Sequence, residues 1–300
     1  MKILFTFPGQ GAQRPGMLQA LPDGETWLNQ ASDVLQEDVR QLDTSGALRH
    51  TRSVQLCLLI SGVAYARTLI AQGIQPDFVS GLSIGAFPAA VVSGALRFDD
   101  ALRLVALRGD LMEQAWPQGY GLTVIIGLTQ RQLEPLLGEC YLANINAEKQ
   151  MVIAGRDEAM TDVARLAREK GARRTCRLAV SVPSHCALLQ EPATRLLAAF
   201  QRVQLKPPTH AYLSGSSGRV LWKPDRIQED LAMNMARTVH WHEAMIAANE
   251  REVGLAIEMP PGSTLSGLTG QAFQYGEAIA LEQSGIPLAI TLAQRARLAR

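Results

Sequence analysis

The stretch from Phe78 to Leu96 carries no charged residue, and it constrains the fold more than any other part of the sequence. Its length alone would suit a membrane-spanning helix. Three glycines, a proline and three serines interrupt it, however, so it cannot form a uniform apolar rod. We therefore expect a buried strand, a tight turn and a buried helix inside a folded core.

Expected strands and helices alternate around this stretch. Lys2 to Phe7 is rich in β-forming residues and runs into Pro8, which predicts a strand that ends in a loop. Ser53 to Leu69 has the composition of a buried helix, and from Phe98 onward apolar residues recur at helical spacing. This alternation predicts an α/β fold whose core is a largely parallel sheet.

The order of elements changes in the middle of the chain. We expect strand, helix, strand, strand, helix and strand at residues 122–127, 130–137, 140–145, 151–154, 158–170 and 173–178. This β-α-β-β-α-β order is the ferredoxin-like motif. We predict a ferredoxin-like domain at 117–188, inserted into a large domain made of 1–116 and 189–300.

Charge and cysteine content exclude several classes of partner. The 29 basic residues nearly balance the 28 acidic ones and form no long block, so we expect neither nucleic acid nor a membrane as a partner. The four cysteines lack metal-ligand spacing and fit a reducing compartment. The N-terminal apolar segment is too short for a secretory signal. We expect a cytoplasmic protein with no bound metal.

Gly81-Leu82-Ser83-Ile84-Gly85 is a G-x-S-x-G pentapeptide between an expected strand and an expected helix. In a nucleophile elbow, small flanking residues allow a strained turn that exposes the serine hydroxyl at the start of a helix. The alternative is a glycine-rich turn that contains a serine by chance. The strand-turn-helix context favours Ser83 as a nucleophile.

A nucleophilic serine needs a base, and the chain has five histidines. His185 lies where the predicted inserted domain returns to the large one, so we expect it at the cleft between them. A purely structural histidine is the alternative. Because no aspartate or glutamate stands out as a third triad member, we predict a dyad of Ser83 and His185, with the imidazole oriented by backbone carbonyls.

Arg108 lies on the predicted buried face of a helix. Its neighbours three and four positions away are all apolar: Leu104, Val105, Leu111 and Met112. A buried guanidinium needs an anion to pair with. An internal salt bridge or a side chain that extends to solvent is one interpretation, and bidentate recognition of a substrate carboxylate is the other.

A glycine-rich loop, Gly9-Gln10-Gly11, follows the first expected strand and could bring a backbone amide near Ser83. The loop has neither the spacing of a P-loop nor that of a dinucleotide-binding fingerprint. We therefore expect neither ATP nor nicotinamide chemistry, and no bound cofactor.

Several motifs, in this order along the chain, resemble the malonyl-CoA:acyl carrier protein transacylases from about Phe5 to Leu268. They are Phe7-Pro8-Gly9-Gln10-Gly11, the serine elbow, Leu107-Arg108-Gly109, Asn144-Ile145-Asn146 with Val152-Ile153-Ala154-Gly155, Val180-Ser181-Val182-Pro183-Ser184-His185, and Glu258-Met259-Pro260-Pro261-Gly262 with Leu265-Ser266-Gly267-Leu268. The family fold is an α/β-hydrolase-like core with a ferredoxin-like insertion, in agreement with the expected order of elements.

The resemblance implies a ping-pong acyl transfer. Ser83, activated by His185, would attack the thioester of malonyl-CoA and release CoA. The backbone amides of Gln10 and Ile84 would hold the oxyanion, and Arg108 would pair with the free malonyl carboxylate. The acceptor would be the phosphopantetheine-type thiol of an acyl carrier protein.

The resemblance also extends to Gln55, which matches a family glutamine near the pocket, and it has departures. The family usually has histidine and glutamate where this chain has Leu82 and Ala86. A family glutamine whose backbone supports the base aligns ambiguously around 249–251, and we assign no role there. The elbow looks most like that of the epsilon subunit of malonate decarboxylase, which loads malonyl onto a carrier subunit with a modified dephospho-CoA arm.

Three hypotheses remain open from the sequence. The first is a malonyl transacylase, serving either malonate decarboxylase or fatty-acid synthesis. The second is an esterase or thioesterase, against which Arg108 and the missing triad acid count. The third is a non-catalytic assembly subunit that kept the fold, suggested by Leu82 and Ala86.

Overall fold

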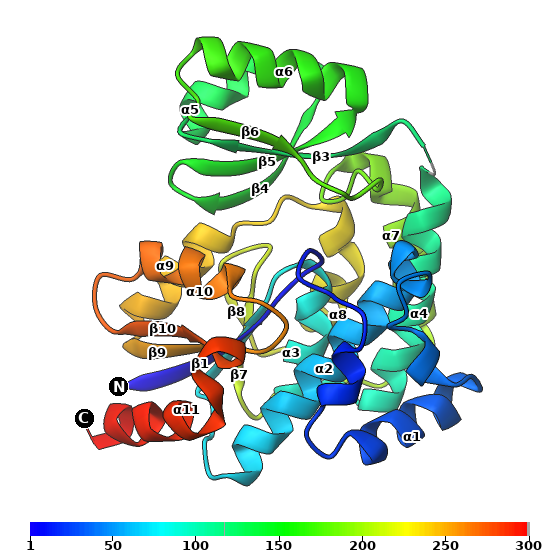
Figure 1. Ribbon diagram of the computed structural model, residues 1–300, viewed down its shortest axis with the longest axis vertical. Helices are drawn as coiled ribbons and strands as arrows, with labels where there is room; N and C mark the ends of the chain where they lie inside the picture. Colours follow the sequence, from blue (N-terminus) through cyan, green and yellow to red (C-terminus); the bar gives the residue numbers. More distant parts are fainter. Residues whose placement is uncertain (117, 299–300) are drawn as a thin grey trace.

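Two sheets organise the computed structural model, which describes residues 1–116 and 118–298. The larger sheet has the strand order β10-β9-β1-β2-β7-β8 and lies in the lower part of Figure 1. Its strands are β1 (Lys2–Phe7), β2 (Phe78–Gly81), β7 (Ala211–Ser214), β8 (Val220–Leu221), β9 (Val253–Glu258) and β10 (Glu277–Ala280). Its neighbouring strands are parallel except for β7 and β8. The predicted parallel-sheet core is confirmed.

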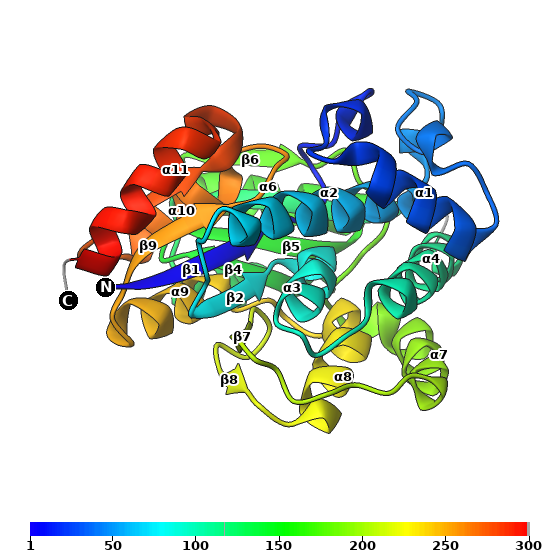
Figure 2. The same cartoon turned by 90° about the horizontal axis from the view of Figure 1, so that it is seen from below.

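Helices cover both faces of this sheet, and further helices pack on these. They are α1 (Gly24–Leu35), α2 (Thr51–Ala71), α3 (Ala86–Val92), α4 (Phe98–Ala115), α7 (Gln190–Ala199), α8 (Pro224–Met233), α9 (Trp241–Glu250), α10 (Thr264–Ala272) and α11 (Leu281–Leu298). Alternate residues of β1 point to opposite faces: Phe5 and Phe7 pack in the core under α2 and α11, and Leu4 packs with α9 and α10. Figure 2 shows α2 and α11 on one side of β1 and α9 on the other.

The apolar segments of the chain form this core. The stretch from Phe78 to Leu96 folds into β2, a tight turn and α3, as the sequence predicts. Of the described helices, α2 is the one long and apolar enough to cross a membrane by length and composition, and 72% of its most apolar window is buried inside the protein. Its buried apolar residues belong to the core cluster shared with α3, α4 and α11.

The smaller sheet has the order β4-β5-β3-β6, and all of its neighbouring strands are antiparallel. Its elements are β3 (Tyr120–Ile126), α5 (Gln130–Leu133), β4 (Tyr141–Ala147), β5 (Gln150–Arg156), α6 (Asp157–Glu169) and β6 (Arg174–Arg177). The ferredoxin-like order is thereby confirmed. The predicted boundary at Pro117 lies outside the described residues, and the division into domains stays a prediction.

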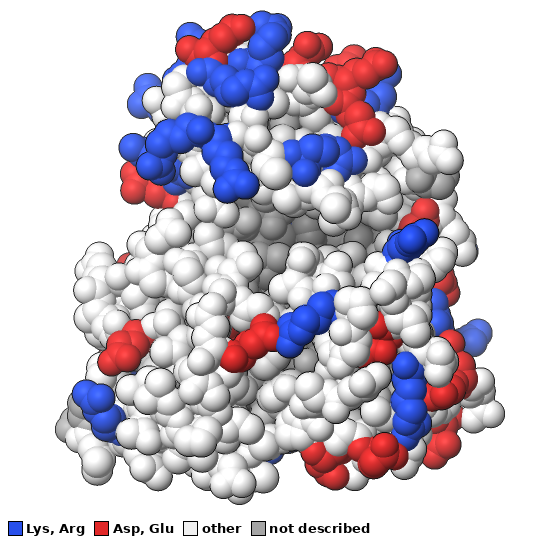
Figure 3. Space-filling view, in the orientation of Figure 1, with Lys and Arg blue, Asp and Glu red and all other residues white. Residues whose placement is uncertain are grey.

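We call the small sheet with α5 and α6 the small unit, and the large sheet with its helices the large unit. A short segment of the large unit, between α8 and α9, extends the small sheet. The backbone N–H of Val239 donates to the Ala143 carbonyl at 2.8 Å, and the Ile145 N–H donates to the Val239 carbonyl at 2.8 Å. The residues just before Val239 are therefore held between the two sheets. Figure 3 shows that the molecular surface is hollowed between the two units, and charged side chains are sparse in this hollow.

Candidate active site

Ser83 lies at a sharp turn between β2 and α3. Its φ of 57° is in the left-handed region, which is strained for a serine. The turn closes because its glycines have no side chain: a Cβ on Gly81 would lie 1.9 Å from the Gly85 carbonyl carbon, and a Cβ on Gly85 would lie 2.1 Å from the Phe7 oxygen. The sequence thus folds locally into the strained strand-turn-helix expected of a nucleophile elbow.

His185 meets Ser83 across the space between the two units. Its Nε2 lies 2.9 Å from Ser83 Oγ, and its Nδ1 lies 2.8 Å from the carbonyl oxygen of Asn234. Because a carbonyl can only accept, Nδ1 carries the proton and Nε2 is free to accept the serine hydroxyl. The predicted orientation by a backbone carbonyl is therefore present in the structure.

The environment of His185 keeps its imidazole neutral. Burial, helped by the nearby Arg108 charge, lowers the pKa of His185 to about 4, against the opposing effect of the Asn234 carbonyl. The side chain is 3% exposed. At neutral pH the imidazole is therefore unprotonated at Nε2, which is the state that a general base requires.

Arg108 is fully buried, as predicted, and its guanidinium reaches the nucleophile. Nη2 donates to Ser83 Oγ at 3.2 Å and to Asn234 Oδ1 at 2.9 Å, and Nη1 donates to Gln55 Oε1 at 2.8 Å. Burial lowers the pKa of Arg108 to about 9, which leaves it protonated at neutral pH. Within residues 1–116 and 118–298 it forms no salt bridge, so the interpretation as an internal ion pair is wrong.

The loop after β1 packs against the elbow. A Cβ on Gly9 would lie 2.9 Å from Leu82 Cδ2 and 3.7 Å from Ser83 Cβ, so the backbone at Gly9 passes close to the nucleophile. The next residue, Gln10, accepts a hydrogen bond at its side chain from Gln55 Nε2 at 3.3 Å. Ile84 directly follows Ser83 in the helical turn. The structure thus brings the predicted residues together, and the oxyanion role of the Gln10 and Ile84 amides stays a prediction.

Sequence reasoning missed Asn234, which contacts three parts of the site. Its carbonyl binds His185, its Oδ1 binds Arg108, and its Nδ2 donates to the Ser83 carbonyl at 3.3 Å. The supporting backbone group therefore lies at 234 and not in the ambiguous region around 249–251, where Asn249 instead holds the loop at Tyr275. The one signal for Asn234 in the sequence is its position between two methionines at the end of an expected amphipathic helix.

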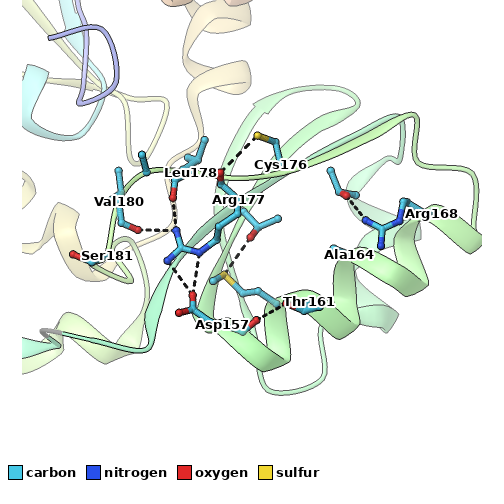
Figure 4. A pocket seen from close by; sticks show the side chains of 13 residues that line it. Asp157, Thr161, Ala164, Arg168, Cys176, Arg177, Leu178, Val180 and Ser181 are labelled. Carbon is cyan, nitrogen blue, oxygen red and sulfur yellow. Dashed lines mark hydrogen bonds and ion pairs between the residues drawn. The ribbon is translucent and has the colours of Figure 1, made fainter. Parts of the chain in front are cut away.

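Two cavities border the small unit. One, of about 360 Å³, is lined by His185 together with Tyr141, Ile145 and Ala236, so it opens onto the base. The other, of about 670 Å³, lies between α6 and β6 beside Arg177, away from Ser83 (Figure 4). No cluster of three or more His, Cys, Asp or Glu side chains suited to a metal occurs among the described residues.

An elbow serine, a neutral histidine and a buried arginine that is hydrogen-bonded only to neutral groups among the described residues lie together at this site. Residues 4–285 match the model of the acyl transferase domain family. The chain belongs to this family. Within the family it belongs to the malonyl CoA-acyl carrier protein transacylases.

Individual relatives cover nearly the whole chain. A malonyl CoA-acyl carrier protein transacylase of Haemophilus influenzae is 36% identical over 89% of this chain and 91% of its own. The solved structure of such a transacylase from Coxiella burnetii has a TM-score of 0.91 at 30% identity, covering 99% of this chain and 98% of that one. A malonyl-transacylase in complex with a type II polyketide synthase acyl carrier protein has a TM-score of 0.90 at 32% identity, covering 98% and 100%.

Proposed function

We propose that this protein transfers a malonyl group from CoA to the thiol of a carrier protein through an ester on Ser83. One observation carries the proposal: His185 Nε2 and Arg108 Nη2 both lie within 3.2 Å of Ser83 Oγ. A base and a cation at one hydroxyl suit an acyl group that ends in a carboxylate. An esterase for neutral esters has no use for the cation.

The reaction has two half-reactions. In the first, His185 takes the Ser83 proton as Oγ attacks the malonyl thioester, the amides of Gln10 and Ile84 stabilise the oxyanion, and CoA leaves as the thiol. In the second, the carrier's phosphopantetheine-type thiol attacks the ester and gives its proton to His185, which returns it to Ser83. Arg108, supported by Gln55, holds the malonyl carboxylate throughout.

The carrier that accepts the malonyl group is the finer part of the proposal. The Gly81-Leu82-Ser83-Ile84-Gly85-Ala86 elbow favours the carrier subunit of malonate decarboxylase. Fatty-acid synthesis is the second candidate, favoured by the relatives, which are named as malonyl CoA-acyl carrier protein transacylases. A cytoplasmic location, predicted from the sequence, belongs to the same proposal.

The experiment incubates the purified protein with malonyl-CoA and measures the intact mass. We expect a malonyl adduct on Ser83 that is absent from Ser83→Ala. Portions of the malonylated enzyme are then incubated in buffer alone, with a fatty-acid carrier protein, or with a malonate decarboxylase carrier subunit. Transfer to a carrier supports a transacylase, rapid loss to water indicates a thioesterase, and absence of an adduct indicates a non-catalytic subunit.

A further inference from the structure

The acceptors around the Arg108 guanidinium are all neutral. Gln55 Oε1 and Asn234 Oδ1 are amide oxygens, and Ser83 Oγ is a hydroxyl. The guanidinium is also 5.8 Å from the centroid of the Phe87 ring, and its Nε has no hydrogen-bond partner among the described residues. A buried cation is usually compensated by a carboxylate. The charge of Arg108 is therefore available to pair with the carboxylate of a bound ligand.

The Asn234 amide has one orientation that satisfies its neighbours. Its Oδ1 accepts from Arg108 at 2.9 Å, and its Nδ2 donates to the Ser83 carbonyl at 3.3 Å. If the amide were flipped, its N–H groups would face the N–H groups of the guanidinium, and its oxygen would face the Ser83 carbonyl oxygen. Neither hydrogen bond could then form. The side chain therefore ties the position of the guanidinium to the backbone of the nucleophile.

The backbone that carries Asn234 is firmly held. It follows α8, in which the buried Asp230 accepts from Tyr212 at 2.7 Å and from Ser214 at 2.6 Å. Asp230 thus fastens α8 to β7, and one helical turn later the chain presents a neutral amide to Arg108. Asn234 itself is 2% exposed. The carboxylate of Asp230 lies one helical turn away, but it binds Tyr212 and Ser214 of β7 and not the Arg108 guanidinium.

We propose that the Asn234 side chain is a specificity-determining positioning residue. It holds the Arg108 guanidinium beside Ser83 without neutralising it, so that the charge is kept for the carboxylate of the acyl group. The inference rests on the proposed malonyl transfer. It differs from the role of the Asn234 carbonyl, which orients His185 through the main chain and would survive any substitution of the side chain.

Asn234→Asp tests the inference because it changes one NH2 group to an oxygen at nearly constant shape. The new carboxylate would pair with Arg108 and would compete with the substrate carboxylate for it. We expect kcat/KM for malonyl-CoA to fall about 100-fold, the range of one or two charge-assisted hydrogen bonds. Acetyl-CoA has no carboxylate, so its kcat/KM should change much less.

The measurement is kcat/KM for malonyl-CoA and for acetyl-CoA in the wild type, Asn234→Asp and Asn234→Ala. Asn249→Asp is the matched control, because Asn249 is a second buried asparagine whose side-chain hydrogen bonds, within the part of the chain that the structure describes, go to Val253 and to the loop at Gln274 and Tyr275. It should lose stability without a change in the malonyl-to-acetyl ratio. If Asn234→Asp does not fold, Asn234→Ala should still lower that ratio about tenfold.

The outcomes separate the inference from the proposed function. If the wild type forms no malonyl adduct, the proposed function fails. If the wild type transfers malonyl and both Asn234 variants lose malonyl and acetyl activity in parallel, the side chain only supports the fold and the inference is wrong. A ratio that falls in the Asn234 variants and stays constant in Asn249→Asp supports it.

Discussion

Arg108 Nη2 lies 3.2 Å from Ser83 Oγ, so the proposed carboxylate-binding group and the proposed nucleophile are in direct contact. An acyl group bound to both must therefore be short. Malonyl has a single carbon between its carboxylate and its thioester carbonyl, and this spacing suits two groups that are adjacent in the protein. Burial of a cation without a carboxylate partner is costly, and such strain is typical of functional sites.

This geometry predicts selection by chain length. Succinyl-CoA has one more methylene than malonyl-CoA, so binding its carboxylate at Arg108 would displace the thioester carbonyl by about 1 Å from its position of attack. A displacement of that size costs about 100-fold in rate. The check is acylation of Ser83 by each thioester at equal concentration, followed by intact mass. Equal rates would mean that Arg108 does not set the position of the acyl group.

The second prediction concerns pH and His185. Its pKa is about 4 in the folded protein and about 6.5 in the unfolded chain. Between these values the unfolded chain binds more protons, so stability rises with pH: the contribution is complete above about pH 6.5 and is lost as pH falls through about 4. It amounts to about 3 kcal/mol.

Two measurements check this. Unfolding free energies of the wild type and His185→Asn, followed from pH 7 to pH 4, should converge or cross as the medium becomes acidic. The acidic limb of kcat/KM for malonyl-CoA should have its midpoint well below 6. A midpoint near 6.5 would show that His185 is accessible to water in the working enzyme.

How much the sequence could predict depends on the range of the interactions. Ser83 was predictable because its elbow is a local pattern of five residues, and Arg108 because its burial follows from helical spacing. Both sheets were predictable in the same way, from the alternation of short apolar segments. The strand bounds shifted by one or two residues because pairing across the sheet, not composition, determines where a strand ends.

Asn234 could not be predicted because its contacts are distant in sequence. It lies 49 residues from His185 and 126 from Arg108, and an asparagine between methionines has no motif of its own. The bridge between Val239 and Asn144, which pairs the segment before α9 with β4, was hidden for the same reason. Such contacts exist only once the whole chain has folded.

The third prediction concerns Arg177, which fastens the segment that leads to His185. Its guanidinium donates to the carbonyls of Tyr120 and Val180, each at 2.8 Å, and pairs with Asp157 at 2.9 Å. Figure 4 shows the contacts with Val180 and Asp157. Gly121 leaves room for it, since a Cβ there would lie 2.0 Å from Arg177 Nη2. Arg177→Ala should lower stability by about 2 kcal/mol and loosen residues 178–182.

Thermal unfolding and limited proteolysis check the effect of Arg177→Ala. The matched control is Arg174→Ala, because Arg174 is an exposed arginine on the same strand and its side chain makes no hydrogen bond among the described residues. We expect faster cleavage at 178–182 in Arg177→Ala and wild-type behaviour in Arg174→Ala. The same result in both variants would mean that charge in this strand matters and the clamp on the loop does not.

The last prediction tests Arg108 itself. In Arg108→Ala the malonyl carboxylate would enter a buried site without a partner, since the remaining acceptors and donors around it are the neutral groups of Gln55, Asn234 and Ser83. Loss of one member of a buried charge pair costs about 3 to 5 kcal/mol. At about 1.4 kcal/mol per tenfold change, this predicts a fall of two to three orders of magnitude in malonyl transfer.

Acetyl-CoA provides the contrast for Arg108→Ala, because it has no carboxylate to lose a partner. Its kcat/KM should change little, and it can rise where the small alanine leaves space. Arg67→Ala is the control, since Arg67 is an exposed arginine that donates to the Val91 carbonyl away from the site. A crossing of the preference from malonyl to acetyl identifies Arg108 as the carboxylate-binding group, whereas a parallel fall for both thioesters means that the guanidinium only holds Gln55, Asn234 and Ser83 together.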